Sequence, residues 1–276
     1  MRAVRLVLRT LGCFFASIVL ALVCIVGLPV AMLLGRSPRW RSVMTRVWAR
    51  TLGWIVGMRV ERVGPVPEGP VLLVANHLSY VDIFLLGGSF PCAFISKAEV
   101  ARWPGIGQLA TLAGTLFLDR TRRKDVRRIA AEMQSVLDSG RAVVFFPEGT
   151  STSGDDVAPF RSSLLEPPAA AAIPVHYASL SYETPPGEVP ARLSVAWWGD
   201  MDLAPHLTHL LQMPGFRARI VFGEAPITGT DRKELTLALE EAVRAGFTPM
   251  GSPAIEDASA GRSASAATSP SSAAGS

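Results

Sequence analysis

A histidine and an aspartate stand five residues apart in the stretch VLLVANHLSYVD, residues 71–82. An apolar run leads directly into His77, which places the imidazole at the end of a predicted strand, and Asp82 follows across a turn into a helix. At this spacing the carboxylate can accept a hydrogen bond from Nδ1–H, which fixes the tautomer and leaves Nε2 as a proton acceptor. The pair predicts general-base chemistry, and taken alone it also fits a structural histidine.

Two further predicted strands end in polar residues. The segment TLFLDR ends in Arg120, and VVFFPEGT contains Glu148. Because ligands bind at the carboxyl ends of strands in an open α/β sheet, we expect one site to collect these two residues and His77. The histidine and the aspartate make two-thirds of a hydrolase triad without an evident nucleophile.

Four motifs occur in the order NHLSYVD, GTLFLDR, FFPEGT and IPV. Their order and spacing resemble those of the 1-acylglycerol-3-phosphate O-acyltransferase (PlsC-like lysophospholipid acyltransferase) family over roughly residues 60–230. The resemblance implies a glycerolipid acyltransferase-like α/β fold with a mixed central sheet flanked by helices. It also implies transfer of a fatty acyl group from acyl-CoA or acyl-ACP to the hydroxyl of a lysolipid, which then supplies the nucleophile. No metal and no cofactor beyond the acyl carrier is implied.

The resemblance also implies a role for each candidate residue. His77 would be the general base and Asp82 would orient it. Arg120 would contact the head group of the acceptor, and Glu148 would bind acceptor hydroxyls or order Arg120. Lys97, in FISKAEV, resembles a family position as well, although an exposed lysine is the simpler interpretation.

The third motif supplies two more candidates and one departure from the family. Backbone N–H groups at Gly149 and Thr150 are candidates to stabilise the acyl oxyanion. Many members that form phosphatidic acid read FPEGTRS here, whereas this chain reads FPEGTSTSG, with Ser151 in place of the arginine. The departure weakens the inference of a phosphate on the acceptor, and Arg161 in PFRSSLL is a candidate to restore a cation nearby.

The acceptor expected from the commoner family activity is 1-acylglycerol-3-phosphate, which gives phosphatidic acid. The alternative is a lyso-ornithine lipid. A small polar residue after FPEGT and the stretch VAWWGDMDLAPHL both resemble that branch of the family.

The N-terminal part of the chain predicts a membrane element. Residues 11–35 carry no charge, and a helix of that length crosses roughly 30 Å of hydrocarbon. Arginines on both flanks and Pro29 inside the run also suit a helix or bent hairpin in one leaflet. The arginines that follow the run favour a catalytic domain on the cytoplasmic side of the cell inner membrane. Residues 47–60 predict either an interfacial helix or an amphipathic helix packed on the domain.

The rest of the chain alternates short apolar runs with helices, which is typical of an α/β domain. We expect strands at residues 71–75, 115–118, 142–146, 173–177, 193–198 and 218–222, and amphipathic helices at residues 121–140 and 231–246. The expected regions are an anchor and interfacial helix at 1–60, the acyltransferase domain at 61–250 and a disordered Ala/Ser/Gly-rich tail at 251–276.

Composition narrows the classes of partner. A net charge of +4 favours an anionic partner, and 24 arginines against 3 lysines indicate a GC-rich, bacterial source. We find no P-loop, Rossmann fingerprint, metal cluster or nucleic-acid-binding motif, so membrane lipid is the expected partner. Two other classes stay open: a membrane serine hydrolase using Ser151, although GTSTSG is not a nucleophile elbow, and a non-catalytic membrane module, which has no need for His77 and Asp82.

Overall fold

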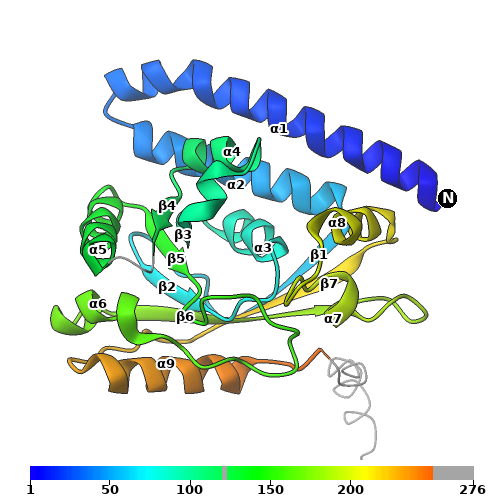
Figure 1. Ribbon diagram of the computed structural model, residues 1–276. Coiled ribbons are helices and arrows are strands. Elements are labelled where there is room, and N and C mark those ends of the chain that lie inside the picture. The colour runs from blue at the N-terminus through cyan, green and yellow to red at the C-terminus, as the bar shows by residue number, and fades with distance from the viewer. Residues whose placement is uncertain (120–122, 251–276) are drawn as a thin grey trace, which may run out of the picture.

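A mixed seven-stranded sheet forms the centre of the protein, as seen in a computed structural model that describes residues 1–119 and 123–250 (Figure 1). Within this part the strand order is β1-β7-β6-β2-β5-β3-β4. The strands are β1 Met58–Val63, β2 Leu72–Ala75, β3 Cys92–Lys97, β4 Leu116–Leu118, β5 Ala142–Phe145, β6 Val175–Glu183 and β7 Phe216–Phe222. β6 and β7 pair antiparallel and all other neighbours pair parallel, so the expectation of a mixed α/β sheet is confirmed.

Helices cover both faces of the sheet. The α-helices are α1 Arg2–Leu33, α2 Ser37–Ile55, α3 Val81–Ser89, α4 Ile106–Ala113, α5 Arg123–Asp138, α6 Glu166–Ala170, α7 Ala191–Ser194, α8 Leu203–Gln212 and α9 Arg232–Gly246. Helices α5, α6 and α9 lie on one face, α3 and α8 lie on the other, and α1 and α2 form a layer outside α3 (Figure 1). The central strands are therefore buried on both faces, and β2 and β5 are apolar throughout.

Five of the six expected strands are present, and two strands were not expected. β3 has the sequence CAFISK and lies between β5 and β4, where it was missed. β1, with the sequence MRVERV, pairs with β7 at one end of the sheet order. Three of its six residues are charged, Arg59, Glu61 and Arg62, as is common in a strand at the edge of a sheet. The sheet therefore begins at Met58, inside the region assigned to the anchor and interfacial helix.

The strand expected at residues 193–198 is wrong. This segment consists of the end of α7 and an irregular stretch that contains Trp197 and Trp198. Val195 and Ala196 are buried without pairing in the sheet, and the backbone N–H of Trp197 donates to the carbonyl of Leu78 at 2.8 Å. A buried loop segment here has the same run of apolar residues as a buried strand. The segment instead packs on the loop that follows β2.

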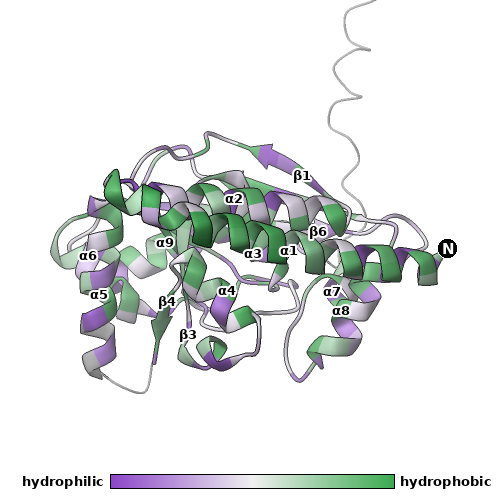
Figure 2. Cartoon of the chain, turned by 90° about the horizontal axis from the view of Figure 1, so that it is seen from above, coloured by the Kyte–Doolittle hydropathy of each residue, from purple (hydrophilic) through white to green (hydrophobic). Residues whose placement is uncertain are grey.

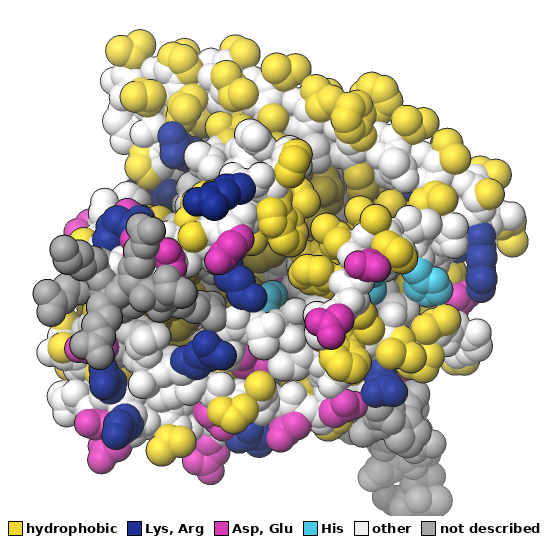
Figure 3. All heavy atoms as spheres, viewed as in Figure 1, with side chains coloured by type: hydrophobic (Ala, Val, Ile, Leu, Met, Phe, Trp, Pro, Cys, Tyr) yellow, Lys and Arg dark blue, Asp and Glu magenta, His cyan; other side chains and the backbone are white. Residues whose placement is uncertain are grey.

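Helix α1 exposes its apolar surface along most of its length. Among the described residues it is the helix long and apolar enough to cross a membrane, and only 6% of its most apolar stretch is buried. Figure 2 shows α1 hydrophobic over nearly all of its visible side, and Figure 3 shows the same apolar side chains along the edge of the molecule. An apolar surface of this extent is typical of a membrane or protein contact.

The first turns of α1 nevertheless pack on the α/β domain. Arg5 Nη1 donates to the carbonyl of Gln212 at 2.6 Å, and Arg9 Nη1 donates to that of Met213 at 2.7 Å. Both carbonyls lie at the C-terminal end of α8, where carbonyl groups lack helical partners and carry partial negative charge. The two arginines therefore fix one end of α1 to α8.

Helix α2 has one buried face and one exposed face. Ser42, Thr45 and Ala49 are buried within the fold, whereas Val43, Val47 and Trp54 are exposed. Trp54 is 80% exposed, which is unusual for so large an apolar side chain. The expectation of a helix packed on the domain is confirmed for the buried face, and the exposed face keeps the composition of an interfacial helix. The tail expected at residues 251–276 lies outside the described residues.

Candidate active site

His77 stands just beyond the end of β2, in the middle of the sheet. Before it, Asn76 Nδ2 donates to the carbonyl of Leu180 at 3.0 Å, and Asn76 Oδ1 accepts from the N–H of Leu180 at 2.7 Å. The amide side chain thus pairs with β6 as a strand backbone would. This pairing ends the strand at Ala75 and frees the chain at His77 to turn towards α3.

The predicted histidine–aspartate pair is present. His77 Nδ1 lies 2.7 Å from Asp82 Oδ2 in the first turn of α3, and the carboxylate is fully buried. The same oxygen accepts from the N–H groups of Leu78 at 2.8 Å and Ser79 at 3.0 Å. The imidazole stacks on Phe146, with ring centroids 4.1 Å apart, and 23% of its side chain remains exposed. Because Nδ1 is held by the carboxylate, Nε2 is the nitrogen available to take a proton.

Glu148 supports the histidine loop from the end of β5. Its side chain is buried, and Oε1 accepts from the backbone N–H of His77 at 2.8 Å. Burial raises the pKa of this carboxyl to about 8. Glu148 therefore joins the ends of β2 and β5, a role that the sequence did not suggest.

We expect Glu148→Gln to stabilise the protein at alkaline pH. The folded pKa lies above the unfolded value of about 4.3, so the native state holds a proton that the unfolded state releases. Wild-type stability then falls as pH rises from that unfolded value towards about 8, by at most about 1.4 kcal/mol per pH unit. Glutamine keeps an acceptor for the His77 N–H and does not ionise. Melting temperatures of both proteins from pH 5 to pH 8 should diverge with rising pH, and parallel curves would contradict this assignment.

The loop after Glu148 is a tight turn. Gly149 has a φ of +83°, which favours glycine, and its N–H donates to the carbonyl of Phe146 at 3.1 Å. That N–H closes the turn, so Thr150 keeps the role of candidate oxyanion donor. The N–H of Thr152 donates to the carbonyl of His77 at 2.9 Å. The turn is therefore attached to the histidine loop on both sides.

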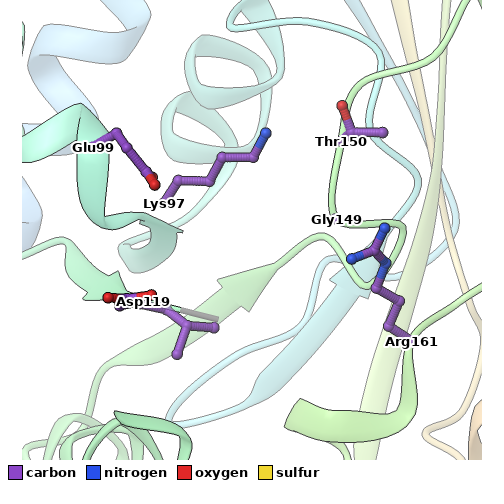
Figure 4. A pocket seen from close by; sticks show the side chains of 7 residues that line it. Lys97, Glu99, Asp119, Gly149, Thr150 and Arg161 are labelled. Carbon is purple, nitrogen blue, oxygen red and sulfur yellow. The ribbon is translucent and has the colours of Figure 1, made fainter. Parts of the chain in front are cut away.

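A cavity of about 320 Å³ adjoins this loop. It is lined by Lys97, Glu99, Leu118, Asp119, Gly149, Thr150 and Arg161. Figure 4 shows Lys97, Glu99 and Asp119 on one side of the cavity and Thr150 and Arg161 on the opposite side. The structure thus brings Lys97 and Arg161 to the same place as the third motif. Arg120 lies outside the described residues.

Three supporting residues escaped the sequence analysis. Asn76 and Phe146 both lie inside quoted motifs, next to residues that were identified, so their position was a usable signal. Tyr182, on β6, donates its hydroxyl to Asp82 Oδ1 at 2.5 Å. It stands 100 residues from Asp82 and carries no motif, so nothing in the sequence pointed to it.

The His77–Asp82 pair at the end of a central strand fits an acyltransferase in which the hydroxyl of the substrate is the nucleophile. The chain belongs to the Acyltransferase family, whose model matches residues 57–180. This membership decides against the serine hydrolase and the non-catalytic module.

Individual relatives agree with the family assignment. The chain is 33% identical over 219 residues to the lyso-ornithine lipid O-acyltransferase of Brucella abortus (strain 2308), covering 75% of this chain and 82% of the relative. It is 34% identical over 195 residues to the 1-acyl-sn-glycerol-3-phosphate acyltransferase of Neisseria meningitidis serogroup B (strain MC58), covering 69% and 74%. Its fold is similar to the crystal structure of the 1-acyl-sn-glycerophosphate (LPA) acyltransferase from Thermotoga maritima, with a TM-score of 0.64, 22% identity and coverage of 89% and 96%. The protein is a lysolipid acyltransferase.

Proposed function

We propose that this acyltransferase transfers an acyl group from a coenzyme A or acyl carrier protein thioester to the hydroxyl of a lyso-ornithine lipid. The observation that carries the choice of acceptor is the mixed charge of the cavity beside Glu148. Lys97 and Arg161 supply cations, and Glu99 supplies a carboxylate to the same space. An ornithine head group carries both a carboxylate and an ammonium, so it complements a cavity that holds both signs of charge.

The proposed reaction uses the histidine, the aspartate, Thr150 as candidate oxyanion donor, and the two substrates. The lysolipid hydroxyl oxygen attacks the carbonyl carbon of the thioester while His77 Nε2 takes the hydroxyl proton. A C–O bond forms, the carbonyl oxygen becomes an oxyanion near Thr150, and Asp82 stabilises the imidazolium. Collapse of this intermediate breaks the C–S bond, and the imidazolium returns the proton to the departing thiolate. The products are the ester and the free thiol.

The second candidate acceptor is 1-acylglycerol-3-phosphate, which the commoner family activity favours. Lys97 and Arg161 together could hold a phosphate, and the relative from Neisseria meningitidis carries this name. Against it stands Ser151, which replaces the motif arginine, and the carboxylate of Glu99 beside the cations. A dianionic head group gains nothing from that carboxylate, whereas a zwitterion does.

We also propose that α1 attaches the enzyme to the cell inner membrane, with the catalytic domain on the cytoplasmic side. The exposed apolar surface of α1 supports membrane insertion. Because Arg5 and Arg9 fix one end of α1 to α8, and α1 runs beside α2, the helix follows the surface of the domain (Figure 1). This geometry supports insertion into one leaflet, with Trp54 on α2 at the interface.

The acceptor can be tested with one panel of lysolipids. Membranes that carry the enzyme are incubated with a labelled acyl thioester and either lyso-ornithine lipid or 1-acylglycerol-3-phosphate, and the products are identified by mass. We expect Glu99→Gln to lower activity on lyso-ornithine lipid about 10-fold or more, because a charge-assisted hydrogen bond contributes about 1.5–3 kcal/mol. Activity on 1-acylglycerol-3-phosphate should stay the same or rise.

Two variants complete this test. Arg161→Gln should lower activity on both acceptors, since both head groups carry an anion. Glu224→Gln is the matched control, because Glu224 is exposed and lies outside the lining of the cavity. A wild-type enzyme that prefers 1-acylglycerol-3-phosphate, or a Glu99→Gln variant that loses both activities equally, would overturn the choice of acceptor and leave the acyltransferase chemistry intact.

A further inference from the structure

We propose that Tyr182 is a positioning residue for acyl transfer, which orients Asp82 and, through it, His77. Tyr182 lies on β6, and its hydroxyl donates to Asp82 Oδ1 at 2.5 Å. Both side chains are buried, Tyr182 at 3% exposure and Asp82 at 0%. The phenol therefore reaches the reacting histidine through one intermediate carboxylate.

The two oxygens of Asp82 are held by different parts of the fold. Oδ2 accepts from His77 Nδ1 and from the N–H groups of Leu78 and Ser79, all on the short loop that carries the histidine. Oδ1 accepts from Tyr182, its partner among the described residues, which stands in the sheet. Tyr182 thus ties the orientation of the carboxylate to β6, whereas the other donors move with the loop.

The phenol is itself fixed in place. At Tyr182, β6 pairs with Ala218 of β7, and two residues earlier Leu180 pairs with the side chain of Asn76. The Tyr182 ring packs edge-on against Phe216, with ring centroids 5.9 Å apart. The backbone N–H of Tyr182 donates to Met250 Sδ at 3.3 Å. Burial raises the pKa of the phenol well above its usual value, so the hydroxyl keeps its proton and can only donate to the carboxylate.

Donation by Tyr182 also adjusts the basicity of the pair. A hydrogen bond to the charged carboxylate spreads its negative charge and makes it a weaker acceptor for the imidazolium. Other ionisable groups near the pair are Glu148, whose Oε1 binds the His77 N–H, and, more distantly on α9, Glu240, which interacts with Glu148. Removing the phenol hydroxyl leaves Oδ1 without a donor and should strengthen the attraction between Asp82 and the protonated ring.

The test is the pH dependence of kcat/KM for Tyr182→Phe, measured with whichever lysolipid the wild type acylates fastest. The inference rests on the histidine–aspartate chemistry, so it does not depend on the choice of acceptor. We expect kcat to fall about 10-fold with little change in KM, because Asp82 loses the contact that fixes its orientation, and this loss outweighs the stronger attraction for the imidazolium. The acid limb of the kcat/KM profile should move to higher pH by about 0.5 to 1 pH unit, because a better stabilised imidazolium needs a higher pH to lose its proton.

The matched control is Tyr177→Phe, on the opposite face of the same strand. Tyr177 packs against the other hydrophobic cluster, away from Asp82, so its rate and pH profile should match the wild type. If Tyr182→Phe shows the wild-type rate and acid limb, or if Tyr177→Phe shifts the limb equally, the proposal is overturned.

A second variant covers the case in which Tyr182→Phe fails to fold. Replacement of Tyr182 by 3-fluorotyrosine keeps the shape of the ring and makes its hydroxyl a stronger donor. The acid limb should then move to lower pH, opposite to the direction expected for phenylalanine. A purely structural tyrosine would shift the limb in neither variant, and that result would refute a positioning role.

Discussion

We expect His77→Ala to lower kcat by about 10²- to 10⁴-fold, the usual contribution of a positioned general base. The imidazole is the group that can take the proton of the attacking hydroxyl. Glu148, the ionisable side chain at the end of β5, is buried against the backbone of His77. Alanine keeps the backbone N–H that binds Glu148. The loss should therefore appear in turnover.

The fold should tolerate this change. The His77 side chain is 23% exposed and makes one side-chain hydrogen bond, and Asp82 keeps its donors from Leu78, Ser79 and Tyr182. Turnover and thermal melting are measured together, with His176→Ala as the control histidine on β6. Retention of more than a few per cent of activity in His77→Ala would remove this residue from the role of base.

Asp82→Ala should lose both activity and stability. The carboxylate accepts from the N–H groups of Leu78 and Ser79, from Tyr182 and from His77, in a site with no exposure to solvent. Alanine leaves three of these donors buried without an acceptor, and each costs about 1–3 kcal/mol. We expect the free energy of unfolding to fall by about 3–5 kcal/mol, as measured by denaturant titration.

Asp82→Asn separates the two effects. The amide oxygen can still accept from the loop N–H groups, so most of the stability should remain, but a neutral side chain stabilises the imidazolium poorly. Turnover should fall about 10²- to 10⁴-fold while the unfolding transition stays close to the wild type. Asp202→Asn, at an exposed position with no side-chain cap to α8, is the control. Wild-type turnover in Asp82→Asn would exclude Asp82 from the mechanism.

The sequence by itself determined the features that depend on short segments. His77 and Asp82 are joined by five residues, so a strand end followed by a turn is sufficient to bring them together. The apolar run of α1 and the helical periodicity of α5 and α9 are likewise local, and each appears close to its expected position. The Asp231 side chain accepts from the N–H groups of Lys233 and Glu234 and caps α9, so the start of this helix could be predicted from the sequence.

Only the tertiary structure decided the features that depend on contacts between distant segments. Glu148 was expected to bind acceptor hydroxyls or to order Arg120, and its contact with the backbone N–H of His77, 71 residues away, appears only in the structure. Tyr182 meets Asp82 because β6 pairs parallel with β2 and continues past the end of β2, from Ala178 opposite Ala75 to Glu183. The stretch at residues 193–198 was mistaken for a strand, since burial under a loop and burial in a sheet select the same apolar residues. The spacing of apolar residues in the sequence indicates whether a residue is buried. The residue that it contacts depends on the order of the strands in the sheet, and local spacing carries no information on that order.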